Sequence, residues 1–130
     1  MPDQQNHLKK SKHNESFYKS FDVDRTPYKD WIVVGVFYAA LHLIDAYLAT
    51  KNIHPHSHGM REREMMQDDW VKKNRELDPI WLNYRDLKEF RMKASYKMYE
   101  FTAHEIQREV FPLLESIKKD LHNLDPATFN

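Results

Sequence analysis

Residues 31–49 read WIVVGVFYAALHLIDAYLA, an apolar run that only Gly35, His42 and Asp45 interrupt. A stretch of this length and composition is typical either of a membrane span or of a helix that is buried on all sides. An aspartate inside a single short span costs free energy in lipid, and the rest of the chain is strongly polar. We therefore expect this segment to be the central helix of a helical bundle, with no membrane association.

The composition limits the classes of protein to which the chain can belong. Its 130 residues suit a single domain over 1–130, and 41% of them are hydrophobic, too many for a disordered chain. Lys plus Arg and Asp plus Glu both number 20, which excludes a strongly basic nucleic-acid coat protein. The lack of cysteine excludes disulfides, thiol catalysis and zinc–thiolate sites. The polar first twenty residues contain no signal peptide, so we expect a cytoplasmic location.

Caps, prolines and apolar spacing predict an all-α fold. Thr26 and Pro27 suit the start of the central helix, and Thr102 suits the start of the last one, with Glu105 completing a capping box. Pro112 is expected to kink that last helix. Tails over 1–7 and 125–130 are expected to be loose. Helices are expected at about 8–21, 27–51, 58–74, 79–97 and 102–124.

Each of the last three predicted helices carries an apolar stripe at helical spacing. The third is expected to pack through Met60, Met65, Met66, Trp70 and Val71. The fourth is expected to pack through Ile80, Tyr84, Leu87, Ala94 and Met98. The last is expected to pack through Ile106, Val110, Leu113, Leu114, Ile117, Leu121 and Leu124.

Arg91 falls within the apolar stripe of the predicted fourth helix, where a helix that only packs would carry leucine. A guanidinium on a buried face must be paired, or must face a cavity or a partner. On the central helix, Tyr38, His42 and Asp45 share one face at spacings of four and three. We expect Asp45 to pair with Arg91, with His42 beside it. The pair is either a structural ion pair or part of a polar site between helices or subunits.

Histidines alternate with other residues in the segment His54-Pro55-His56-Ser57-His58. Spacing of two across a proline is not that of a helical ligand pair, so we expect no metal site and no cofactor. Ser57 or His56 is expected to cap the following helix. His58 and Arg61 are three residues apart and share a face of its first turn, where they either bind an anion such as phosphate or form a solvated cap.

The segment 85–97, RDLKEFRMKASYK, carries five positive and two negative charges. Aromatic residues interleave with the positive charges, a pattern that favours nucleic acid because cations neutralise phosphates and rings stack on bases. Residues 98–125 carry three positive and six negative charges, so the alternative is that basic and acidic faces pair within a dimer. The candidate ligand-binding residues are Tyr38, His42, Asp45, Arg61, Tyr84 and Lys88.

Several motifs together resemble the HEPN superfamily (higher eukaryote and prokaryote nucleotide-binding). FYAALH resembles its second-helix signature, HSHGMRE the loop and helix start that follow, and LKEFRMKASY its fourth-helix pattern. The resemblance covers residues 28–124. It implies an antiparallel bundle of four to five helices, commonly a homodimer. Many such proteins are metal-independent ribonucleases of toxin–antitoxin or defence systems, and others bind RNA, nucleotides or a nucleotidyltransferase partner without catalysis.

Active members of that superfamily carry an arginine and a histidine that are separated by four to six residues. Arg91 matches the arginine, but Tyr96 stands where the histidine is expected. A phenol is a poor general base at neutral pH. The resemblance therefore favours a non-catalytic domain that binds RNA, a nucleotide or a partner. One alternative is a divergent ribonuclease that uses Arg91 with Tyr96 or His58 at a dimer cleft, and another is a purely structural dimer module.

Overall fold

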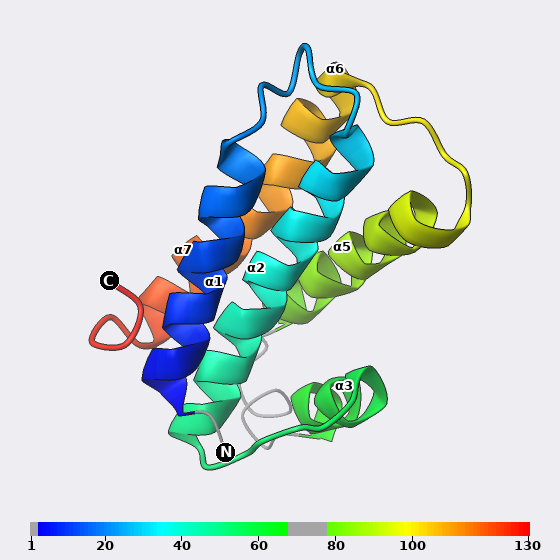
Figure 1. The fold of residues 1–130 in the computed structure, drawn as a ribbon. Coiled ribbons are helices and arrows are strands. Elements are labelled where there is room, and N and C mark those ends of the chain that lie inside the picture. The colour runs from blue at the N-terminus through cyan, green and yellow to red at the C-terminus, as the bar shows by residue number, and fades with distance from the viewer. Residues whose placement is uncertain (1–2, 68–77) are drawn as a thin grey trace.

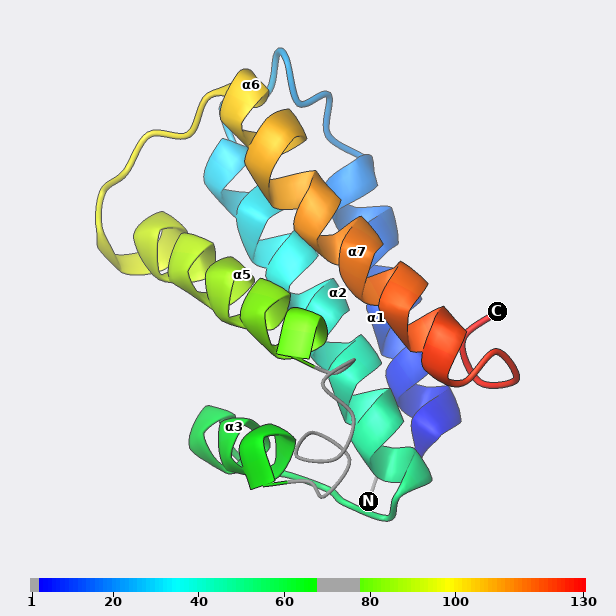
Figure 2. The same cartoon turned by 180° about the vertical axis from the view of Figure 1, so that it is seen from behind.

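The computed structural model describes residues 3–67 and 78–130, and every regular element in these ranges is a helix. The long helices run in alternating directions, which makes the described part an antiparallel bundle (Figure 1). In Figure 2, which views the molecule from behind, α5 and α7 lie in front of α2, and the short α3 lies apart from them. The predicted all-α bundle of four to five helices is confirmed. The elements are α1 (Gln4–Lys19), α2 (Lys29–Thr50), α3 (His58–Gln67), α5 (Asp78–Tyr96), α6 (Ala103–Glu105), η2 (Ile106–Val110) and α7 (Phe111–Leu124).

Helix α2 is the centre of the hydrophobic core. Fourteen of its 22 residues are buried, and it contacts α1, α5 and α7. Among the described helices it is the one that is long and apolar enough to cross a membrane, and 72% of its apolar window is buried inside the bundle. The other helices thus cover the side chains that a membrane span would expose to lipid.

The ends of α2 follow local backbone chemistry. The Thr26 hydroxyl accepts a hydrogen bond from the Tyr28 N–H at 3.0 Å, so it stabilises the turn before the helix rather than the helix itself. Helix α2 begins at Lys29, two residues after the predicted start. At the other end Asn52 adopts a φ of 58°, a left-handed conformation that asparagine tolerates and that ends the helix close to the predicted residue.

Gly35 allows α1 and α2 to approach each other closely. A Cβ atom at this position would lie 3.0 Å from the Cβ of Tyr18, which is tighter than normal packing. We expect Gly35→Ala to lower the free energy of unfolding by about 1–3 kcal/mol through overpacking, although alanine is the better helix former. Denaturant unfolding measures the change. The control is Gly59→Ala in α3, where a Cβ meets only the Ser57 hydroxyl at 4.0 Å, and a loss of stability there equal to that at position 35 would contradict the packing explanation.

The described residues near both ends of the chain are more closely packed into the bundle than the sequence predicts. Helix α1 begins at Gln4 rather than at about residue 8, because the Asp3 carboxylate accepts a hydrogen bond from the Asn6 N–H at 2.9 Å and caps the first turn. At the other end Phe129 is 7% exposed and packs in the core, and His122 contacts its carbonyl group. The expectation of loose residues at 1–7 and 125–130 is therefore wrong for Gln4 to His7 and for Phe129.

The last helix is interrupted rather than simply kinked. Thr102 caps it as predicted and accepts a hydrogen bond from the Glu105 N–H at 3.0 Å. The chain then forms the π-helical segment η2 and continues as α7, with Pro112 in the first turn of α7, where a missing N–H is tolerated. Most of the predicted stripe is buried, namely Ile106, Val110, Leu114, Ile117 and Leu121.

The predicted stripes of the two middle helices are confirmed only in part. Ile80, Tyr84 and Leu87 are buried in α5, but Met98 is 99% exposed because the helix ends at Tyr96. Met65 of α3 is buried as predicted, but the expectation that Met60 packs is wrong, because its side chain is 38% exposed. The other predicted contacts of that helix at positions 66, 70 and 71 lie outside the described side chains.

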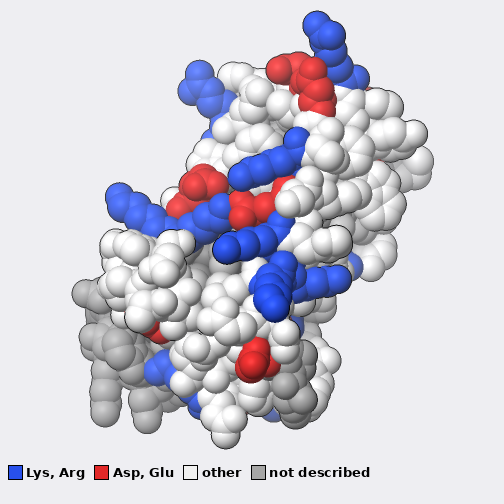
Figure 3. Space-filling view, turned by 60° about the vertical axis from the view of Figure 1, so that its left-hand side comes forward, with Lys and Arg blue, Asp and Glu red and all other residues white. Residues whose placement is uncertain are grey.

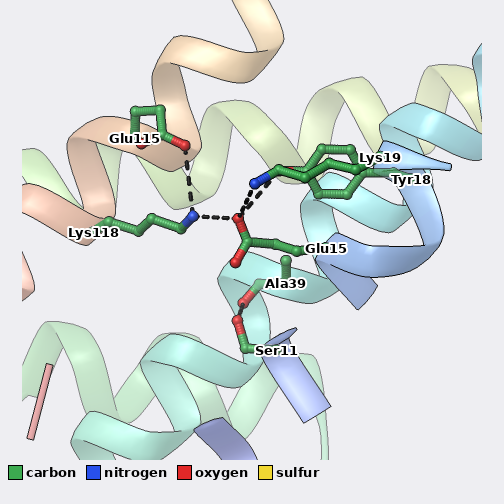
Figure 4. Close-up of polar contacts among 7 residues, drawn as sticks. All are labelled: Ser11, Glu15, Tyr18, Lys19, Ala39, Glu115 and Lys118. Carbon is green, nitrogen blue, oxygen red and sulfur yellow. Dashed lines mark hydrogen bonds and ion pairs between the residues drawn. The ribbon is translucent and has the colours of Figure 1, made fainter. Parts of the chain in front are cut away.

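Polar side chains also join the helices. Figure 4 shows Glu15 of α1 directed at Lys118 of α7, which it binds, and Lys19 lies 3.4 Å from the same carboxylate. The hydroxyl of Ser11 is buried and donates a hydrogen bond to the carbonyl oxygen of Ala39 at 2.7 Å. These contacts fix the position of α1 along α2 and α7.

Candidate functional site

Arg91 of α5 lies in a group of aromatic rings contributed by α2 and by its own helix. Its guanidinium carbon is 5.8 Å from the ring centre of Phe37, 5.7 Å from that of Tyr38 and 5.4 Å from that of Tyr96. One guanidinium nitrogen donates a hydrogen bond to the Tyr38 hydroxyl at 3.1 Å. We call these four residues the Arg91 cluster.

Arg91 forms no ion pair with any carboxylate of residues 3–67 and 78–130, the part of the chain that the structure describes. Among the described residues no Asp or Glu oxygen lies within ion-pair distance of its guanidinium. Its Nε is buried and has no hydrogen-bond partner in the described part of the chain. A buried, unsatisfied donor on a charged group costs free energy, so the cluster favours the arrival of an anion.

The predicted pairing of Arg91 with Asp45 is wrong. Asp45 instead accepts two hydrogen bonds from Arg61, at 2.6 Å from Nε and 2.9 Å from a terminal nitrogen, in a buried bidentate pair. Arg91 contacts Tyr38, which lies seven residues before Asp45 on α2. Seven residues correspond to a rise of about 10 Å, so one guanidinium does not reach both side chains.

His58 contacts the Asp45–Arg61 pair and the aromatic group of α2. Its Nδ1 is 3.4 Å from a guanidinium nitrogen of Arg61, and its ring centre is 5.8 Å from that of Phe37. Burial lowers the pKa of His58, and the positive charges of Arg61, Lys88 and Arg91 lower it further. The imidazole is therefore neutral at pH 7. Because arginine only donates, Nδ1 accepts and Nε2 carries the proton.

Helix α3 is joined to α5 by the remaining predicted ligand residues. Lys88 binds Glu62 of α3, so its charge is compensated. Tyr84 is fully buried close to Arg61, and its hydroxyl makes no hydrogen bond of good geometry to any described residue. Burial raises the pKa of Tyr84 to about 12, so the phenol stays protonated. Arg61 and Lys88 are thus each paired with a carboxylate, and these two ion pairs connect α3 to α2 and α5.

The structure therefore brings together only part of the predicted site. Arg91, Tyr38 and Tyr96 meet in one cluster, and His58 lies at its edge through Phe37. Tyr96 is 65% exposed, so the cluster opens to solvent at the end of α5. The sequence did not single out Phe37, because a phenylalanine in an apolar run is read as core.

His42 faces a different neighbour. Its Nδ1 lies 3.2 Å from the Nδ1 of His7 of α1, and both side chains are half-buried. Burial lowers the pKa of both rings, that of His42 to about 4. The sequence missed this pair because the first seven residues were expected to be loose.

A groove of about 670 Å³ lies between α1, α7 and the C-terminal residues. Figure 3 shows basic side chains gathered around a few acidic ones on the side of the molecule that carries these helices. Lys118 is already bound to Glu15 and lies 3.5 Å from Glu115. The groove therefore has mixed charge rather than a uniform basic surface. Its lysines are Lys9, Lys12, Lys118 and Lys119.

The chain was compared with protein-family models, with curated proteins and with solved structures, and no match was found in any of the three. The interpretation of the site therefore depends on its own geometry. That geometry is a cation with no counter-ion among the described residues, held between aromatic rings at an exposed helix end.

Proposed function

We propose that this chain is a non-catalytic helical domain that binds RNA or a nucleotide through the Arg91 cluster. The observation that supports the proposal most strongly is the guanidinium of Arg91, which forms no ion pair with any described carboxylate and lies beside the exposed ring of Tyr96. A phosphate group supplies both the charge and the acceptor oxygens that this side chain lacks.

The rings around Arg91 fit the same ligand. In the absence of an anion, three aromatic faces within 6 Å hold the guanidinium by cation–π attraction and keep it oriented. The exposed ring of Tyr96 is free to stack on a base while Arg91 contacts the adjoining phosphate.

The protonation of the His58 ring favours RNA binding over the alternative of RNA cleavage. A general base needs an unprotonated nitrogen that reaches the ribose hydroxyl. The unprotonated Nδ1 of His58 faces Arg61, and the nitrogen left over carries a proton. The pocket therefore offers donors to a phosphate but no base to the nucleophile, which is what a binding domain requires.

Fluorescence anisotropy with a labelled single-stranded RNA at low salt tests the proposal. We expect Arg91→Gln to weaken binding about 10- to 100-fold, the effect of losing a charge-assisted hydrogen bond of about 1.5–3 kcal/mol. Arg85→Gln is the matched control, because it removes the same charge from an exposed position of the same helix. The affinity of the wild-type protein should fall as salt rises, with a shallower slope for Arg91→Gln.

Three results would contradict this proposal. The proposal fails if the wild-type protein does not bind RNA or a nucleotide at low salt. It also fails if the Arg91→Gln and Arg85→Gln variants bind equally well. Cleavage of the RNA in the presence of EDTA, lost in Arg91→Gln at unchanged melting temperature, replaces it with the ribonuclease alternative.

The resemblance to the HEPN superfamily extends the proposal to assembly and biological role. On that basis we propose a cytoplasmic homodimer that acts in a toxin–antitoxin or defence-type system, with a nucleotidyltransferase-type protein as a further partner. Light scattering of the purified protein tests the dimer, and a monomer at all concentrations removes it.

A further inference from the structure

Two imidazoles converge where the N-terminal part of α1 packs against α2. The Nδ1 atoms of His7 and His42 are 3.2 Å apart, and the ring centres are 5.5 Å apart with an angle of 28° between the rings. Asp45 lies three residues after His42 on the same face of α2. One ring nitrogen of each histidine and a carboxylate oxygen of Asp45 all lie within 4.8 Å of one another.

The separation of the two nitrogen atoms matches that of a pair of metal ligands. Imidazole nitrogens bind zinc at about 2.0–2.1 Å, so two of them at a tetrahedral centre are about 3.3 Å apart. Two neutral imidazoles, one as donor and one as acceptor, also satisfy each other at this distance. The carboxylate of Asp45, within 4.8 Å of a nitrogen of each ring, is what distinguishes a ligand set from a simple hydrogen bond.

The carboxylate of Asp45 is oriented by Arg61, which uses one lone pair on each oxygen. A second lone pair on each oxygen remains available to a metal ion or to a water molecule bound to it. Outer hydrogen bonds of this kind fix the direction of ligating carboxylates.

We propose that His7, His42 and Asp45 bind a divalent transition-metal ion, with Zn²⁺ as the ion that this donor set suits best. Two imidazoles and one carboxylate leave a fourth position for water. The ion connects the first turns of α1 to the middle of the core helix, so it stabilises the folded state in proportion to its binding. The site is separate from the Arg91 cluster, and the proposal does not depend on RNA binding.

Calorimetric titration of the metal-free full chain with zinc chloride tests the proposal. We expect one ion per chain, and binding at least about tenfold weaker in His7→Ala and in His42→Ala, since even the loss of a ligand's outer partner costs that much. The controls are His13→Ala, an exposed histidine of α1, and His56→Ala, an exposed histidine of the loop before α3. Both should bind as the wild type does.

Thermal unfolding provides a second measurement on the same variants. Zinc should raise the melting temperature of the wild type and of both controls, and should leave that of His7→Ala unchanged. His7→Asn serves if the alanine variant does not fold. The proposal fails if the wild type does not bind zinc, if His7→Ala and His7→Asn bind it unchanged, or if His56→Ala rather than His7→Ala abolishes binding.

Discussion

Replacing Asp45 with asparagine is expected to lower the free energy of unfolding by about 3–5 kcal/mol. The reason is the bidentate contact with Arg61, in which the side chains are only 6% and 8% exposed. Asparagine keeps the size of the side chain but removes the charge, so the buried guanidinium loses its compensation. Urea unfolding followed by circular dichroism measures the change. Because the Arg61 pair joins α3 to α2, we also expect α3 to be more open to proteolysis in the variant.

The matched control is Asp86→Asn on the exposed face of α5, which should change stability by less than about 0.5 kcal/mol. A second variant separates the pair from the individual charges. Replacing both partners, Asp45→Leu with Arg61→Met, should recover much of the lost stability, because no buried charge then lacks a partner. If Asp45→Asn unfolds no more easily than Asp86→Asn, the bidentate contact does not form in solution.

Acidification is expected to destabilise the protein before its carboxylates titrate. The pKa of His42 is lowered to about 4, chiefly by burial and also by the charges of His7, Lys10 and Arg61, while Asp45 opposes the shift. The unfolded state, with a histidine pKa of about 6.5, then binds the proton more readily than the folded state. The contribution of His42 to the free energy of unfolding is therefore fully present above pH 6.5 and is lost as the pH drops towards 4. Allowing for partial exposure of the ring, we expect a loss of about 1–2 kcal/mol between pH 8 and pH 5.

Urea unfolding in EDTA at a series of pH values measures this loss without interference from metal ions. His42→Gln should flatten the profile between pH 8 and pH 5, because glutamine does not titrate. His13→Gln, at an exposed position, should leave it unchanged. A profile that is the same for His42→Gln and for the wild type would show that other groups cause the pH dependence.

Much of the fold can be predicted from local patterns. The apolar run that contains Phe37 and Asp45 indicates a helix buried on all sides, and the structure places it at the centre of the bundle. The caps at Ser57 and Thr102 are also local, because the hydroxyl and the N–H that it accepts from lie within three residues. Element ends are less predictable where several polar residues compete, as at the start of α1.

The candidate site could be predicted only in its composition. Helical spacing correctly places Tyr38, His42 and Asp45 on a polar side of α2, and it correctly singles out Arg91 as a cation directed inward. Spacing does not say which of two arginines lies opposite the aspartate. Arg61 and Arg91 both approach α2, but at different positions along its axis, so Arg61 meets Asp45 and Arg91 meets Tyr38.

By itself, then, the sequence determined the helices, their buried faces and the presence of charged groups among them, because these depend on residues within a turn or two of each other. Only the tertiary structure decided the partners: Arg61 for Asp45, aromatic rings for Arg91, and His7 for His42. Those partners depend on how far each helix slides along α2 and on which side it packs. Such offsets arise from the packing of many side chains together, and the spacing of residues along one helix does not determine them.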